Sequence, residues 1–127
     1  MKAMGRVTCC LLLAACVVAL LGCGKKAADE TKPVSEVKAE AEKMSVADLR
    51  AMAETYRDKI MAKKGELDTL VKKLADVPLA EKLGEEAKAV QADMDDLGKA
   101  IQALTERFKV YYDKLKEKGG DLSGLEI

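Results

Sequence analysis

The chain has 127 residues, enough for one small domain. Apolar residues make up 49% and charged residues 35%, but aromatic residues only 3%, which favours long helices with a narrow apolar seam over an all-β domain. The charges of the 22 basic and 22 acidic residues cancel, so non-specific electrostatic binding of nucleic acid is not expected. The absence of histidine removes the commonest general base and metal ligand.

The first 22 residues are predicted to be a cleaved signal peptide. Two basic residues, Lys2 and Arg6, precede an uncharged apolar run over 7–21, and this order is typical of secretory signals. The run ends in Leu20-Leu21-Gly22-Cys23, which resembles the lipobox of bacterial lipoproteins. The resemblance implies cleavage after Gly22 and attachment of diacylglycerol to Cys23, which makes the membrane a partner through the lipid.

Two other interpretations of this segment stay open. Residues 7–24 are free of charge and reach the lower length limit of a bilayer span, so they suit an uncleaved anchor, and an ordinary cleaved signal is the third interpretation. In the lipoprotein family, Asp after the acylated Cys commonly retains a protein in the inner membrane. Gly24 stands there, so the outer membrane facing the periplasm is favoured, with the inner or cytoplasmic membrane as the alternative.

The mature chain is predicted to be a tether followed by a helical hairpin. Residues 23–44 contain the lipidated Cys and a polar tether that ends in a marginal helix. Residues 45–118 form the hairpin, with helices at about 45–77 and 79–118, and residues 119–127 form a flexible tail. Ser45 with Asp48 approximates a capping box at the start of the first helix, and Pro78 ends that helix.

Both predicted helices carry apolar residues at alternating steps of three and four, which is the heptad pattern of a coiled coil. The first seam runs through Val46, Leu49, Ala53, Tyr56, Ile60, Lys63, Leu67, Leu70, Leu74 and Val77. The second runs through Ala80, Leu83, Ala87, Val90, Met94, Leu97, Ile101, Leu104, Phe108, Tyr111 and Leu115. Folding at Pro78 places Ala53 opposite Leu104, Tyr56 opposite Ile101 and Val46 opposite Tyr111. The predicted fold is therefore all-α, an antiparallel two-helix coiled-coil hairpin, with dimerisation into a four-helix assembly left open.

The densest acidic group is Asp93, Asp95 and Asp96. On a helix these carboxylates splay around Met94, and the glycine-containing loop of a calcium site is absent, so a solvated face is favoured over a cation site. Lys63 interrupts the first seam, and the predicted register puts it beside Met94, where its ammonium would reach Asp93.

Other candidate contacts are basic pairs, glycines and aromatic residues. The pairs Lys63-Lys64 and Lys72-Lys73 alternate with acids, so a mixed solvated surface is favoured over a lipid or glycan site. Gly84 and Gly98 would admit another helix or simply weaken their own. Phe108 and Tyr111 are expected in the core. Tyr112, on a flank, is the better candidate for a partner contact.

No catalytic residue, metal or cofactor is predicted. Histidine and a free thiol are missing from the mature chain, and its three serines, Ser35, Ser45 and Ser123, have no recognisable base partner. We therefore expect a non-enzymatic structural or adaptor protein that binds a protein partner or a second copy of itself, but no nucleic acid and no small-molecule substrate. A periplasmic chaperone and an accessory subunit of a transport or secretion complex are the alternatives.

The chain also has a broad similarity to murein lipoprotein, a lipid-anchored coiled coil. That family ends in Lys, through which it is attached to peptidoglycan, whereas this sequence ends in Leu125-Glu126-Ile127. Covalent attachment to the cell wall is therefore not expected.

Overall fold

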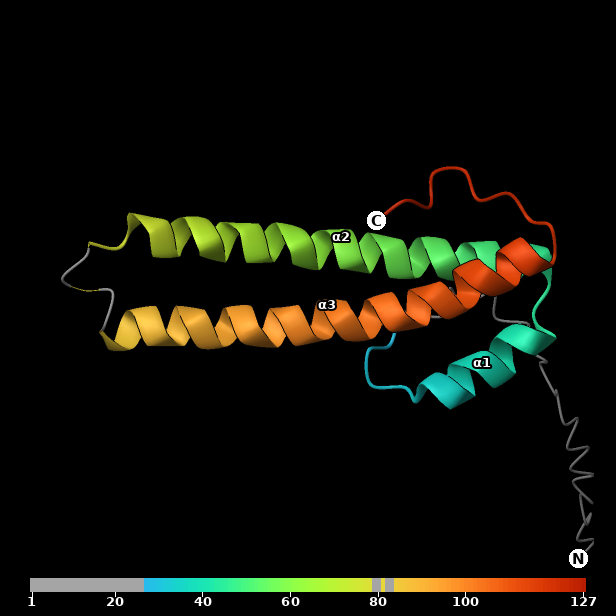
Figure 1. Ribbon diagram of the computed structural model, residues 1–127, viewed down its shortest axis with the longest axis horizontal. Helices are drawn as coiled ribbons and strands as arrows, with labels where there is room; N and C mark the ends of the chain where they lie inside the picture. The colour runs from blue at the N-terminus through green and yellow to red at the C-terminus, as the bar shows by residue number, and fades with distance from the viewer. Residues whose placement is uncertain (1–26, 79–80, 82–83) are drawn as a thin grey trace, which may run out of the picture.

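The computed structural model describes residues 27–78, 81 and 84–127; the predicted signal peptide, Cys23 and the first tether residues lie outside the described residues. All regular structure in the described part is helical, which confirms the all-α class: α1 (Val34–Lys43), α2 (Val46–Asp76) and α3 (Glu85–Glu117). The two long helices, α2 and α3, lie side by side and antiparallel, and we call this pair the rod (Figure 1). Among the described helices, none is both long and apolar enough to cross a bilayer.

Helix α2 begins where the sequence predicts and ends one residue before the predicted boundary. The Ser45 hydroxyl oxygen accepts a hydrogen bond from the Asp48 backbone N–H at 3.1 Å and donates to the Asp48 carboxylate at 2.7 Å. These bonds satisfy an amide that the helix itself leaves unpaired. The helix ends at Asp76, and Pro78 follows two residues later.

Helix α3 begins at Glu85 rather than near residue 79, so the sequence misplaced this boundary by about two turns. Before it, the Glu81 N–H donates to the Pro78 carbonyl and the Gly84 N–H to the Glu81 carbonyl, both at 2.8 Å. The described residues before α3 therefore take part in hydrogen-bonded turns. The later start of α3 permits a register other than the one that follows from a second helix near residue 79.

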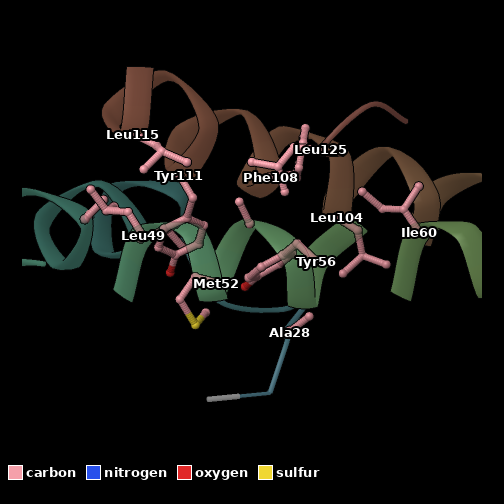
Figure 2. Close-up of a cluster of buried hydrophobic side chains, with 13 residues drawn as sticks. Ala28, Leu49, Met52, Tyr56, Ile60, Leu104, Phe108, Tyr111, Leu115 and Leu125 are labelled. Carbon is pink, nitrogen blue, oxygen red and sulfur yellow. The ribbon is translucent and has the colours of Figure 1, made fainter. Parts of the chain in front are cut away.

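The predicted register between the helices is wrong, by an amount that matches one heptad. It placed Tyr56 opposite Ile101, yet the ring centroids of Tyr56 and Tyr111 are 5.4 Å apart. Ten residues separate Ile101 from Tyr111, about 15 Å along a helix. A shift of seven residues explains the contact, because it places Tyr56 opposite Phe108, one turn from Tyr111. The same shift places Ile60 opposite Leu104, and both side chains lie at the same end of the buried cluster (Figure 2).

The core occupies one half of the rod. Every buried residue of α2 lies between Leu49 and Ile60. The buried apolar cluster consists of Ala28, Val37, Ala41, Leu49, Met52, Ala53, Tyr56, Ile60, Leu104, Phe108, Tyr111, Leu115 and Leu125 (Figure 2). We call residues 46–60 and 104–117 the covered half, and residues 61–76 and 85–103 the open half. In the open half the seam is only half-buried except at Ala87, because two helices alone leave both sides of their seam accessible.

Helix α1 covers one side of the covered half and is a packed element rather than a marginal helix at the end of a tether. Its Val37 and Ala41 are fully buried. Polar contacts fix its end, since the Lys118 ammonium donates to the Met44 carbonyl at 2.7 Å and Lys114 pairs with Glu42 at 2.7 Å. The sequence pattern showed only its short apolar stripe, and docking on α3 supplies the rest of its stability.

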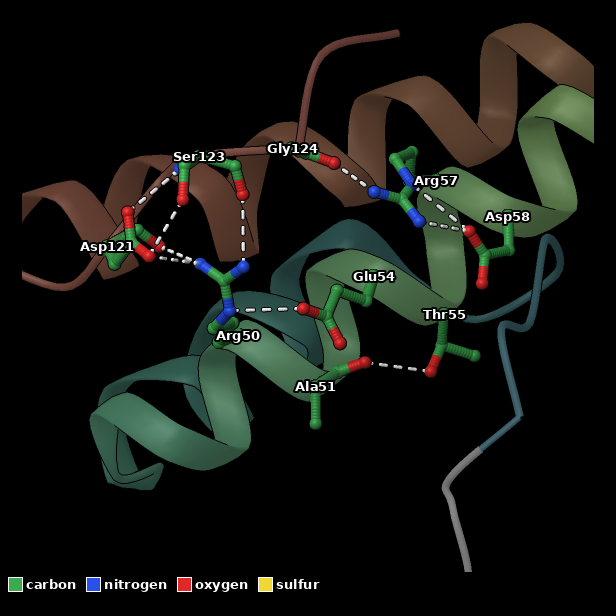
Figure 3. A network of polar contacts seen from close by, with 9 residues as sticks. All are labelled: Arg50, Ala51, Glu54, Thr55, Arg57, Asp58, Asp121, Ser123 and Gly124. Atoms are coloured by element: carbon green, nitrogen blue, oxygen red, sulfur yellow. Dashed lines mark hydrogen bonds and ion pairs between the residues drawn. The ribbon is translucent and has the colours of Figure 1, made fainter.

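The C-terminal segment covers another side and is not the loose tail that we expected. Leu125 is 1% exposed within the core cluster. Arg50 donates to the carbonyls of Asp121 at 2.5 Å and Ser123 at 3.0 Å, and Arg57 donates to the carbonyl of Gly124 (Figure 3). The two arginines, one heptad apart on α2, therefore hold the backbone of residues 121–124 along the helix.

The tyrosine pair predicts alkaline sensitivity. Burial raises the pKa of Tyr111 to about 12, and burial raises the pKa of Tyr56 as well, above the ordinary value of 10.0. Because the folded protein holds the neutral phenols, this contribution to stability is fully present below pH 10.0 and is lost as the pH rises towards about 12. We expect unfolding and tyrosinate absorbance to rise together in this window. A tyrosinate titration that is identical in native and denatured protein would contradict the buried pair.

Candidate functional site

A segment that we call the strap, residues 28–32, crosses the rod and is fixed by its backbone. The Tyr56 hydroxyl accepts a hydrogen bond from the Asp29 N–H at 3.2 Å and donates to the Asp29 carbonyl at 3.0 Å. The Lys59 ammonium donates to the Ala28 carbonyl at 2.8 Å. Ala28 is 6% exposed and belongs to the same buried cluster as Tyr56 (Figure 2).

The far end of the strap is held by Arg107, which sequence reasoning missed. This residue is 7% exposed, and its guanidinium donates to the Lys32 carbonyl at 2.7 Å and the Ala103 carbonyl at 2.6 Å. A buried guanidinium needs such acceptors, because an unpaired buried charge is costly. Lys32 in turn pairs with Glu40 and lies 3.8 Å from Glu36 on α1. No seam periodicity marks Arg107, so only the fold reveals its role.

Beside the strap, a groove of about 580 Å³ runs along the open half of the rod. It is lined by Glu30, Lys63, Glu66, Thr69, Leu70, Asp93, Asp96, Leu97 and Ala100. The strap, α2 and α3 therefore all contribute to one surface. Three residues that the sequence singled out, Lys63, Asp93 and Asp96, line this groove, whereas the remaining acid of the cluster, Asp95, is exposed outside the lining.

The charge of the groove is mainly acidic. Four carboxylates and a single ammonium line it, while Leu70, Leu97 and Ala100 form apolar surface between them. Lys63 lies 3.8 Å from the Glu30 carboxylate, which is its ion-pair partner in place of the predicted Asp93. Lys59 lies at the same distance from Glu30, and the Glu30 Oε2 atom is buried without a hydrogen bond. The groove thus joins an apolar floor to an acidic rim.

The other residues that the sequence singled out on the long helices lie in the core, on its edge or on the surface, away from the groove. Phe108 and Tyr111 are buried in the core, as expected. Tyr112 is half-buried, with its ring centroid 5.6 Å from that of Phe108, so it packs on the core edge. Lys72 pairs with Asp68 at 2.9 Å on the surface. Across the described ranges, no three potential ligands among Asp, Glu, Cys and His gather around a common point where a metal could bind.

The sequence matches no protein-family model, no curated protein and no solved structure.

Proposed function

We propose that this protein is a bacterial envelope lipoprotein, anchored through lipid on Cys23, that acts as a structural or adaptor protein by binding a protein helix in its groove. The outer membrane facing the periplasm is the favoured location. The observation that carries the adaptor role is the groove itself, which joins apolar Leu70 and Leu97 to an acidic rim. Coiled-coil packing of α2 against α3 belongs to the same proposal.

The chemistry of the groove indicates the kind of partner. Half-buried apolar residues gain stability when another helix covers them, and the three exposed carboxylates of Glu66, Asp93 and Asp96 favour a partner with Lys or Arg along its flanks. A basic amphipathic helix combines both features. A second copy of this chain, which would give a four-helix assembly, is the competing occupant.

The anchoring part of the proposal predicts the effect of Cys23→Ser. This change should abolish metabolic labelling by fatty acids and leave the uncleaved precursor, because the peptidase of lipoprotein processing acts on the modified Cys. Labelling and the mass of the mature protein would be measured together. An unchanged mature mass in the variant would refute lipidation at Cys23.

The adaptor part is tested by photo-cross-linking in cells. A photoreactive residue at Thr69, which lines the groove, should form an adduct with one protein, whereas the same residue at the adjacent exposed Asp68 should not. Replacing Asp93 and Asp96 by Lys should reduce the adduct several-fold by removing the rim charge. An adduct of twice the monomer mass would identify the second copy instead, and equal adducts at Thr69 and Asp68 would refute the groove as the binding surface.

A further inference from the structure

The strap determines where the chain enters the rod. Its first residue, Ala28, is bound by Lys59 and lies beside the Tyr56–Asp29 contact. Lys59 is 13 residues from Val46 and 17 residues from Asp76, the ends of α2. At 1.5 Å per residue, the entry point is about 20 Å from one end of the helix and about 26 Å from the other. The chain therefore joins the flank of the rod and not one of its ends.

The strap also shortens the predicted tether. The polar tether within residues 23–44 was expected to be free, but residues 28–32 are bound to α2 and α3. Five residues lead from Cys23 to Ala28, and a fully extended chain of that length spans at most about 17 Å. This is less than the distance from the strap contacts to the Asp76 end of α2 and comparable to their distance from the Val46 end. A rod upright on its Asp76 end would therefore place the entry point beyond the reach of a lipid on Cys23, and a rod upright on its Val46 end would need the free tether fully extended along the helix.

We propose that the strap holds the rod on its flank, with the face that bears the strap and the groove turned towards the bilayer that carries the lipid. This inference rests on the proposed lipidation of Cys23. Glu30 belongs to the strap and also lines the groove, so both features share this face. On the same flank, the ammonium groups of Lys59 and Lys63, whose side chains are 39% and 21% exposed, lie 3.8 Å from Glu30 and offset part of the acidic charge of the groove. A helix in the groove then lies at the membrane surface, where basic amphipathic helices bind.

The test compares two sites on opposite faces of α2. Glu66 lines the groove, and Asp68 is exposed and pairs with Lys72. The two residues are separated by about 3 Å along the axis but by about 200° around the helix. Single cysteines at these sites accept a fluorophore selectively, because lipid blocks Cys23. The full lipidated protein is reconstituted in vesicles of phosphatidylethanolamine and phosphatidylglycerol that contain a quencher on their headgroups. Quenching should be several-fold stronger at Glu66→Cys than at Asp68→Cys.

A strap variant tests the cause of this orientation. Tyr56→Phe with Lys59→Ala keeps the buried ring but removes three hydrogen bonds to the backbone of Ala28 and Asp29. The longer free tether should abolish the difference in quenching between the two labelled sites. The matched control is Tyr112→Phe, which changes a tyrosine on the core edge without a bond to the strap and should leave the difference unchanged.

The outcomes separate this inference from the proposed function. Protein that carries lipid by mass spectrometry and binds vesicles, yet shows equal quenching at both sites, would overturn the flank orientation alone. A difference that persists in the strap variant would overturn the role of the strap. Protein that lacks lipid on Cys23 and does not bind the vesicles would overturn both the anchoring and the inference built on it.

Discussion

Replacing Leu104 by Asp is expected to unfold much of the domain at physiological temperature. Leu104 is fully buried among apolar side chains of the covered half. The change removes apolar contacts and places a carboxylate without a partner in the core, so the free energy of unfolding should fall by about 4 kcal/mol or more. For a domain of this size the melting temperature would fall by roughly 15 °C or more, which thermal melts followed by circular dichroism would measure.

The matched control is Leu97→Asp, one heptad away on the same helix. The sequence pattern alone treats Leu97 and Leu104 as equivalent seam positions, but Leu97 is half-buried and lines the groove. Water can reach the new carboxylate there, so the loss of stability should be much smaller and the helical signal should persist. An equal loss in both variants that depends on protein concentration would indicate that a second copy covers the open half.

The part of the fold that the sequence predicts best is the part where local rules suffice. The Ser45 cap and the end of α2 near Pro78 follow from backbone chemistry within a few residues. The apolar seams identify Leu49, Ile60 and Leu115 correctly as core residues, because a three-four spacing places side chains on one helix face. These features need no knowledge of which element packs on which.

The positions of α1, the C-terminal segment and the strap depend on contacts between residues that are distant in the sequence. Each of these segments is too short for its apolar pattern to predict such contacts. α1 offers only Val37 and Ala41 as buried residues, and the C-terminal segment offers Leu125. Single apolar residues in polar segments are also common in loose chain. Arg107 lies between seam positions, so its role in holding the strap is visible only in the folded structure, where it donates to the Lys32 carbonyl. The groove likewise exists because the covering elements stop short of the open half.

The register fails for a different reason. A heptad pattern repeats, so sliding one helix by seven residues again places seam positions opposite seam positions, and patterning alone hardly distinguishes the two arrangements. The length of the connection and the particular side chains must decide. Here α3 begins at Glu85, and the rings of Tyr56 and Tyr111 meet in the core. The predicted register followed from a second helix that starts near residue 79, and that start is wrong.

Disulfide trapping distinguishes the two registers directly. A soluble chain that starts at Lys25 contains no cysteine, so introduced cysteines pair only with each other. Ile60→Cys with Leu104→Cys should form an intramolecular disulfide rapidly under mild oxidation, because the shifted register puts these two buried residues in one layer. Ala53→Cys with Leu104→Cys, the pair that the sequence-derived register favours, should close poorly.

The comparison is strict because both double variants contain Leu104→Cys and so share its destabilisation. Ala53 lies seven residues from Ile60, about 10 Å along the helix, whereas a disulfide tolerates only about 4.4–6.8 Å between Cα atoms. A static register therefore permits one pair and not the other. Faster closure of the Ala53 pair would restore the sequence-derived register and contradict the Tyr56–Tyr111 contact. Comparable closure of both pairs would mean that α2 and α3 slide by a heptad in solution, so that the strap, the groove and their shared face would not be fixed features of the protein.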